Sequence, residues 1–224
     1  MGRRVPPADR RGIVGLAQPS SPERPYPVGV STPPLPLTFL RSGTRLADLP
    51  ESPVEVAFVG RSNVGKSSLI NALANRKQLA KVSNTPGRTQ LINVFGLPNG
   101  ATVVDLPGYG YAAVPTREKA KWQPMIEGYL LGRDPLEVLL LLVDGEIGPT
   151  KLDLQMIDWV QANGIPYLVI ATKADKVKPS KLAGRQQQVA RACMLEQGDV
   201  FWVSASKGTG IDRLRGHLAE LLTV

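Results

Sequence analysis

Residues 60–67, Gly-Arg-Ser-Asn-Val-Gly-Lys-Ser, constrain the fold of this 224-residue chain more than any other feature. They follow an apolar run at 54–59, which predicts a strand, and they open a predicted helix at 66–75. Glycines in such a loop let backbone N–H groups turn inward around an anion, and the helix N-terminus adds positive potential. The segment is therefore predicted to wrap phosphate groups through Gly60, Arg61, Ser62, Asn63, Val64, Gly65, Lys66 and Ser67.

Two side chains at the end of this loop have predicted roles of their own. Lys66 should neutralise the β- and γ-phosphates of a nucleoside triphosphate, and the Ser67 hydroxyl should bind Mg²⁺. The alternative is a chance glycine-rich turn, which the flanking strand and helix disfavour.

A second motif, Asp105-Leu106-Pro107-Gly108, ends a predicted strand at 102–106. A carboxylate there can hold Mg²⁺ directly or through water, and Gly108 offers a backbone N–H that can approach the γ-phosphate without a side chain in the way. Ras-like enzymes place a water-orienting Gln directly after this motif. Tyr109 stands there instead, so slow intrinsic hydrolysis is predicted.

Two further motifs predict the base site. Thr172-Lys173-Ala174-Asp175 follows an apolar strand at 166–171. The Asp175 carboxylate can accept hydrogen bonds from the N1–H and 2-amino groups of guanine, a donor pair that adenine lacks. A surface turn is the alternative, but the position one strand–helix unit further along the chain favours the base site. Ser204-Ala205-Ser206-Lys207 follows the last predicted strand, and a backbone N–H there should contact guanine O6. Val203, Ser204 and Ala205 are the expected nucleotide contacts in this region.

Apolar runs and helical patterns alternate through the rest of the chain. Strands are predicted at 54–59, 91–95, 102–106, 138–143, 166–171 and 200–203, and helices at 66–75, 122–130, 150–159, 180–196 and 211–222. Pro124 inside the second helix should kink or restart it. The alternation predicts an α/β sandwich around a mostly parallel sheet, a class that places ligand sites at the carboxyl ends of strands.

The first 36 residues differ in composition from the rest of the chain. They hold nine of the twenty prolines and few large apolar residues, so this extension is predicted to be disordered or extended. No apolar run reaches the roughly 18 residues of a membrane span, and no apolar signal core is present, so a cytoplasmic location is expected. The only cysteine, Cys193, should pack as a small hydrophobe. The only histidine, His217, argues against a His-based metal or catalytic site.

These motifs together resemble the EngB (YihA) family of bacterial GTP-binding proteins, within the P-loop GTPases that include TrmE, Era, EngA and the septins. The resemblance rests on GRSNVGKSSLINAL, TPGRTQLINVF, DLPGYGYA, TKAD and SAS, and it extends from about Leu37 to the C-terminus. It implies a Ras-like domain over residues 37–224, with a six-stranded, mostly parallel sheet, one antiparallel edge strand and helices on both faces. The extension at 1–36 has no counterpart in this pattern.

The segment at 83–90 lacks apolar periodicity, as expected of a switch loop that closes on Mg²⁺ and the γ-phosphate. By the resemblance, Thr89 binds Mg²⁺ beside Ser67, with Thr85 as the alternative. The resemblance also adds a run of nucleotide contacts at Gly87, Arg88, Thr89, Gln90 and Leu91.

Catalysis is assigned to Lys66, Asn63 and Gly108. The side-chain carbonyl of Asn63 is expected to coordinate K⁺ beside the phosphates, because this sequence resembles, at that residue, some related GTPases with the GxxNxGK pattern that use potassium in this way. The ion would stabilise transition-state charge in place of an arginine finger. Two alternatives stay open: Asn63 hydrogen-bonds only the loop or the nucleotide, or Arg88 supplies the charge in cis.

The resemblance implies a GTP/GDP switch, with slow Mg²⁺-dependent hydrolysis, that acts in large ribosomal subunit assembly and is needed for normal cell division and septation. A GTP-dependent interaction protein of the division machinery is the alternative, and a monomer is expected. The net charge of +8 favours a polyanionic partner. Between Glu55 and Asp105 no residue is acidic and six are basic: Arg61, Lys66, Arg76, Lys77, Lys81 and Arg88. This positive rim favours rRNA, with an ordinary solvated surface as the alternative.

Overall fold

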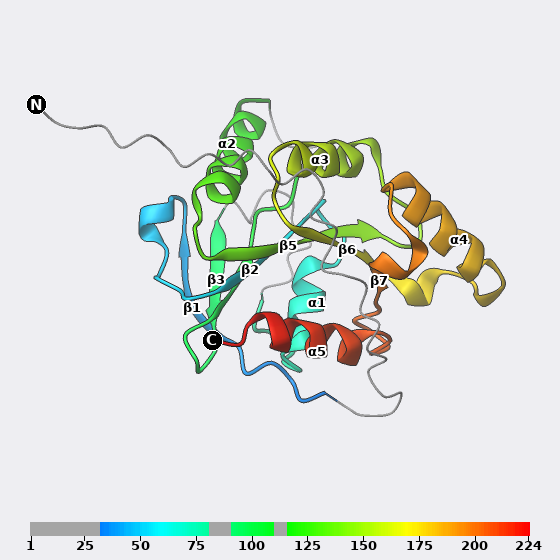
Figure 1. Cartoon of the computed structure of the whole chain (residues 1–224), viewed down its shortest axis with the longest axis horizontal. Helices are drawn as coiled ribbons and strands as arrows, with labels where there is room; N and C mark the ends of the chain where they lie inside the picture. The colour runs from blue at the N-terminus through cyan, green and yellow to red at the C-terminus, as the bar shows by residue number, and fades with distance from the viewer. Residues whose placement is uncertain (1–31, 81–90, 110–115) are drawn as a thin grey trace, which may run out of the picture.

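A seven-stranded sheet runs through the centre of the computed structural model, in the order β1-β3-β4-β2-β5-β6-β7 (Figure 1). The structure describes residues 32–80, 91–109 and 116–224, with side chains in helix α2 from Pro124 onward. The strands are β1 (Thr38–Gly43), β2 (Glu55–Gly60), β3 (Ile92–Gly96), β4 (Thr102–Asp105), β5 (Leu136–Asp144), β6 (Tyr167–Thr172) and β7 (Val200–Trp202). The α-helices are α1 (Lys66–Leu73), α2 (Thr116–Gly132), α3 (Lys151–Ala162), α4 (Pro179–Ala192) and α5 (Ile211–Leu221).

The sheet confirms the predicted mixed, mostly parallel architecture but has one strand more than the six expected. β2 is parallel to β4 and β5, whereas β3 is antiparallel to both of its neighbours, β1 and β4. The antiparallel strand β3 is therefore second from the edge of the sheet, and β1 is the edge strand that pairs with it. β1 is not among the predicted strands, because residues 38–42 are all exposed and the strand lacks the apolar signature of a buried one.

Two hydrophobic cores fill the two faces of the sheet. Alternate residues of β2 point to opposite faces: Val56 and Phe58 pack with α1 and α5, while Ala57 and Val59 pack with α2 and α3. Figure 1 shows α2 and α3 on one side of the sheet and α1 and α5 on the other. Because β2 and β5 are buried on both faces, they read as continuous apolar runs in the sequence.

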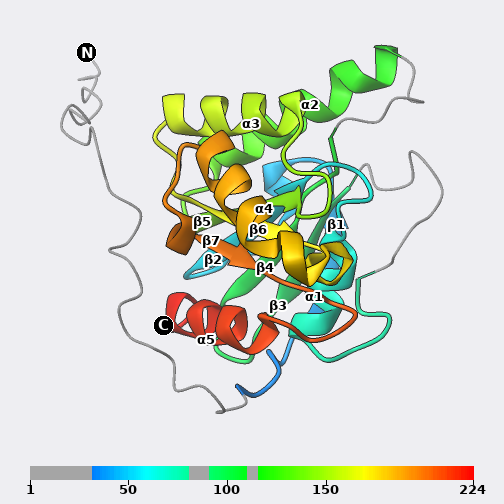
Figure 2. The same cartoon turned by 90° about the vertical axis from the view of Figure 1, so that its right-hand side faces the viewer.

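Helix α4 covers the β6–β7 side of the molecule and lies at the front in Figure 2. Its buried residues Val189 and Ala190 join the core shared with α2 and α3. The helix ends at Ala192 rather than at 196, because Met194 has a left-handed backbone (φ 57°) that an α-helix cannot include. Cys193 caps this helix and is fully buried, as predicted, and burial raises the pKa of its thiol to about 11.

Helix α2 is continuous across Pro124, so the predicted restart does not occur. Pro124 is exposed, and water can therefore satisfy the carbonyl that loses its helical donor. The part of the chain that the structure describes also contains three short 3₁₀ helices, at Leu46–Asp48, Ala174–Lys176 and Gln197–Asp199. Within the described residues, no helix combines the length and the apolar character needed to cross a membrane.

The chain joins the packed body ahead of residue 37, where composition placed the domain boundary. Leu35 is buried, and its backbone N–H donates to the Leu73 carbonyl at the end of α1. Arg215 of α5 donates to the Leu73 and Ala72 carbonyls at 2.9 and 2.6 Å. These donors satisfy carbonyls that the end of a helix leaves unpaired. Residues 1–31 lie outside the described residues.

Candidate nucleotide-binding site

The predicted phosphate loop connects the end of β2 to the start of α1, as the motif requires. Asn63 and Gly65 both have left-handed backbones, with φ of 65° and 102°. Gly60 packs so closely that a Cβ there would lie 2.9 Å from Val64 Cγ1. The glycines thus satisfy two separate constraints: the conformation at 65 and the close packing at 60.

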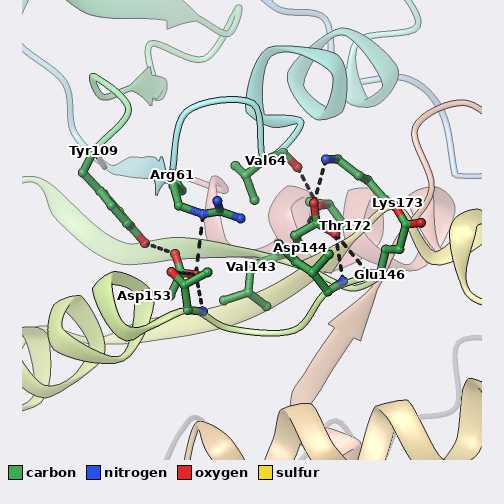
Figure 3. A network of polar contacts seen from close by, with 11 residues as sticks. Arg61, Val64, Tyr109, Val143, Asp144, Glu146, Asp153, Thr172 and Lys173 are labelled. Carbon is green, nitrogen blue, oxygen red and sulfur yellow. Dashed lines mark hydrogen bonds and ion pairs between the residues drawn. The ribbon is translucent and has the colours of Figure 1, made fainter. Parts of the chain in front are cut away.

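The loop is fixed to the neighbouring strands by Thr172 at the end of β6. Its hydroxyl lies 2.6 Å from the Val64 carbonyl and 3.1 Å from the Val143 carbonyl (Figure 3). Thr172 therefore joins the phosphate loop to β5 and β6.

Lys66 and Asp105 lie together at the carboxyl ends of β2 and β4. The Lys66 ammonium forms a largely buried ion pair with the Asp105 carboxylate. Ser67, the next residue of α1, is partly exposed. A carboxylate and a hydroxyl beside the same loop are oxygen ligands of the kind that Mg²⁺ prefers, so these residues fit the predicted ion.

The second motif lies directly against the phosphate loop. The Ser62 N–H donates to the Tyr109 carbonyl at 2.9 Å, and the Tyr109 N–H donates to the Gly60 carbonyl at 3.2 Å. A Cβ at Gly108 would lie 3.1 Å from Ser62 Oγ and 3.2 Å from Ser62 N. Gly108 is therefore required for the approach of these two segments, in addition to any contact with a phosphate.

The phenol of Tyr109 is buried, and its hydroxyl contacts Asp153 of α3. Its hydroxyl donates to Asp153 Oδ1 at 2.9 Å, and Asp153 Oδ2 accepts from the N–H and hydroxyl of Thr150 at 2.7 Å each (Figure 3). Burial, and then the Asp153 charge, hold the pKa of Tyr109 well above its ordinary value. Thr150 is the N-cap of α3, so this helix begins at Lys151.

Arg61 belongs to the same cluster. Its Nε lies 3.9 Å from Asp153 Oδ2 and makes no hydrogen bond with a described residue. The pair brings the phosphate loop and the start of α3 together through a carboxylate that is 1% exposed.

The predicted base motifs meet at the other end of the site. Asp175 Oδ1 accepts from Ser204 Oγ at 2.6 Å, and Oδ2 accepts from Ser206 Oγ at 3.1 Å. The bond from Ser204 is the main cause of the lowered pKa of Asp175. The Ala174 N–H donates to the Val203 carbonyl, which fixes the two segments together. Asp175 itself is exposed, so it can meet a ligand as an oriented, ionised acceptor.

Lys173 is anchored beside this base site. Its left-handed backbone has a φ of 55°, and its ammonium donates to Asp144 Oδ2 at 2.6 Å. Asp144 Oδ1 accepts the backbone N–H of Glu146 at 3.0 Å (Figure 3). Asp144 thus fixes both the loop after β5 and the lysine of the base motif.

The structure brings together most of the residues predicted from sequence, at the carboxyl ends of β2, β4 and β6 and after β7. Leu91 is exposed just before β3. The switch residues Thr85, Gly87, Arg88, Thr89 and Gln90 lie outside the described residues. Asp144 and Asp153 were not predicted from the sequence, whereas Ser206 lies in the predicted base motif but had no role of its own there. Asp144 could have been found, because it ends a buried parallel strand.

Comparison with known proteins agrees with this geometry. The sequence model of the family described as "50S ribosome-binding GTPase" matches residues 55–173. The probable GTP-binding protein EngB of Geobacter sulfurreducens is 44% identical over 82% of this chain and 90% of its own length. That of Desulforamulus reducens is 49% identical over 75% of this chain and 83% of its own length.

The chain belongs to the EngB family of GTP-binding proteins. A crystal structure of a probable GTP-binding protein EngB matches with a TM-score of 0.63 and 25% identity, covering 75% of this chain and 98% of that one. Era in complex with MgGDPNP and nucleotides 1506–1542 of 16S ribosomal RNA matches with a TM-score of 0.59 and 25% identity, covering 78% and 58%. The predicted fold and GTPase family are thereby confirmed.

Proposed function

We propose that this EngB-family chain is a slow, Mg²⁺-dependent GTPase that switches between nucleotide states during large ribosomal subunit assembly. Nucleotide binding, the first part of this proposal, rests on one observation: phosphate-binding and base-binding residues lie within the same site. Lys66 and Asp105 occupy the phosphate end, and Asp175, oriented by Ser204 and Ser206, occupies the base end.

Guanine is the base that fits this arrangement. Asp175 presents two carboxylate oxygens, and the lowered pKa keeps them ionised as acceptors. The N1–H and 2-amino groups of guanine form a matching donor pair. Ser204 and Ser206 restrict the carboxylate before the base arrives, which reduces the entropy lost on binding.

Mg²⁺ is the metal that the phosphate end would hold, through Ser67 and Asp105, with Thr89 added by the family resemblance. When bound, the ion supplies positive charge to the β- and γ-phosphates. Lys66 supplies charge from the protein, and it must exchange its contact with Asp105 for one with the nucleotide.

Slow hydrolysis follows from the position of Tyr109. Its phenol is buried in a bond with Asp153, so it does not orient a water molecule at the phosphate loop. Asn63, by contrast, is exposed and makes no hydrogen bond with another described residue. That arrangement supports Asn63 as a ligand for K⁺ at the phosphates.

The ribosomal part of the proposal draws support from the family description and from the surface of the chain. The matching family is described as 50S ribosome-binding, and Era, a relative of similar fold, has been crystallised with a segment of 16S rRNA. Arg76 and Lys77 are exposed directly after α1, as expected of a positive rim. The cell-division role would follow indirectly from ribosome supply.

This function is tested by sedimentation of the full chain, which is expected to be a monomer, with purified large ribosomal subunits. We expect co-migration with a non-hydrolysable GTP analogue and much less with GDP or without nucleotide. Binding that ignores the nucleotide would contradict a switch. Absence of binding in every state would favour the alternative, a GTP-dependent interaction protein of the division machinery.

A further inference from the structure

The stretch from Lys176 to Leu195, which contains helix α4, carries positive charge without any acidic residue. From Lys176 to Leu195 there is no Asp or Glu, and five residues are basic: Lys176, Lys178, Lys181, Arg185 and Arg191. The acidic residues Asp175 and Glu196 lie just outside this stretch, so the stretch itself is a local source of positive potential.

The outward face of α4 gathers part of this charge in one row. Lys181, Gly184, Gln188 and Arg191 follow the spacing i, i+3, i+7 and i+10, and all four are exposed. Val189 and Ala190 on the opposite face are buried in the core. Figure 2 shows α4 at the surface that faces the viewer.

The two cations of this row, Lys181 and Arg191, form no ion pair with another described residue. No described carboxylate lies within ion-pair distance of Lys181 or Arg191, whereas Arg185, on the flank, donates to the Ile147 carbonyl at 3.3 Å. Gly184 is equally unexplained by internal packing, because a Cβ there would meet no atom within 4 Å. A glycine inside a helix weakens it relative to alanine, so its use here needs a reason outside the fold.

A phosphate backbone accounts for all of these features. Lys and Arg neutralise phosphates, Gln amides donate to phosphate and sugar oxygens, and the missing side chain at Gly184 permits close approach. The row contains no aromatic or aliphatic anchor of the kind that dominates protein–protein interfaces.

We propose that the α4 face formed by Lys181, Gly184, Gln188 and Arg191 binds the phosphate backbone of RNA. This inference rests on the proposed ribosomal role and assigns a surface to it. The contact is separate from the nucleotide site, because none of these four residues belongs to the nucleotide motifs. Phosphate contacts position a protein without reading sequence, so this face should accept duplex RNA of any sequence.

The test uses the full chain with a non-hydrolysable GTP analogue and measures anisotropy of a labelled RNA hairpin across a salt series. The double variant Lys181→Gln/Arg191→Gln should lower the slope of log affinity against log salt by about 2 and the affinity at 0.1 M salt by at least about tenfold. Gln188→Glu should also weaken binding. Gln155→Glu on the exposed face of α3 makes the same chemical change and should have no effect. Guanine nucleotide affinity should stay unchanged in all variants.

An unchanged slope in the double variant would overturn the inference. So would equal losses from Gln188→Glu and Gln155→Glu, which would indicate a net-charge effect without a defined face. If the variants bind the hairpin normally but lose large subunits in sedimentation, the face binds a ribosomal protein and the RNA inference is wrong. A parent that binds the hairpin through α4 but never sediments with large subunits would sustain the RNA contact and refute the ribosomal proposal.

Discussion

Buried charged residues lie at both ends of strand β2, but they differ in how many protein groups bond to them. At the amino end, the Glu55 carboxylate accepts from Thr102, from Tyr129, and from Arg133 through Nε at 2.8 Å and a terminal nitrogen at 3.0 Å. At the carboxyl end, Lys66 has only Asp105 as a charged partner among the described residues, and Asn63 is exposed beside them.

The amino end is a closed network, and the carboxyl end is open to exchange. Glu55 is 0% exposed, and its hydrogen bonds raise the pKa of Arg133, while burial and then Glu55 hold the pKa of Tyr129 well above its usual range. A group with all its acceptor positions filled by the protein stabilises the fold but cannot meet a ligand. The same strand therefore combines a stabilising end with a binding end.

Breaking the closed end should give the largest effect. Glu55→Ala removes the carboxylate and leaves the Arg133 guanidinium without its charged partner, which should lower the free energy of unfolding by about 3–5 kcal/mol. Thermal unfolding of nucleotide-free protein should show a midpoint lower by roughly 6–20 °C. The exposed Glu137 of β5 is the control, since Glu137→Ala should change stability by less than about 0.5 kcal/mol. Equal effects of the two variants would refute the contrast between the ends.

Altering the open end should change ligand choice and leave stability nearly intact. Asp175→Asn replaces an acceptor with an amide that mismatches guanine, so GTP affinity should fall by about 10- to 150-fold. Binding of xanthosine triphosphate should appear, because xanthine can pair with the amide. Isothermal titration with both nucleotides measures the exchange. A variant that binds GTP as tightly as the parent would show that Asp175 does not read the base.

A substitution of Tyr109 tests whether its phenol stabilises the fold or takes part in GTP hydrolysis. Tyr109→Phe removes one donor to the buried Asp153 and should cost about 1 kcal/mol of stability, because Thr150 still bonds that carboxylate. Single-turnover GTP hydrolysis should change by less than about twofold. Tyr167→Phe, at a half-buried tyrosine, is the matched control. A large loss of hydrolysis in Tyr109→Phe alone would assign the phenol to the chemistry.

Asn63 tests which group supplies charge at the open end. GTP turnover of the parent should be several-fold faster in potassium chloride than in sodium chloride at equal ionic strength, because Asn63 is expected to hold K⁺ where it stabilises transition-state charge on the phosphates. Asn63→Ala should remove the difference. Equal parental rates in the two salts would exclude an ion at this position, and a potassium effect that persists in Asn63→Ala would move the ion to other ligands.

The sequence predicted the parts of the fold in which local pattern and burial agree. β2, β5 and β6 are buried on both faces, so their apolar runs were visible along with the motifs that follow them. β1 was missed because its exposed residues are held by pairing with β3, a long-range contact that leaves no local pattern. The end of α4 was misplaced because Met194 adopts a left-handed backbone, which a sequence rarely signals for methionine.

The candidate site was predictable where a residue acts on a ligand and less so where it acts on another residue. Lys66 and Asp175 lie in motifs whose chemistry requires them. Asp153 and Ser206 orient Tyr109 and Asp175 across large separations in the chain, and only the folded structure brings these pairs together. Such supporting contacts depend on tertiary geometry, so spacing in the sequence does not reveal them.

The buried thiol at the end of α4 makes the motion of that helix measurable. Cys193 is the only cysteine, and burial raises the pKa of its thiol to about 11, which lowers the fraction of reactive thiolate in the folded state. Labelling by a thiol reagent should therefore wait for local opening, and its rate should report the free energy of that opening. A ligand seated on the outer face of α4 would slow the labelling of a residue that it never touches.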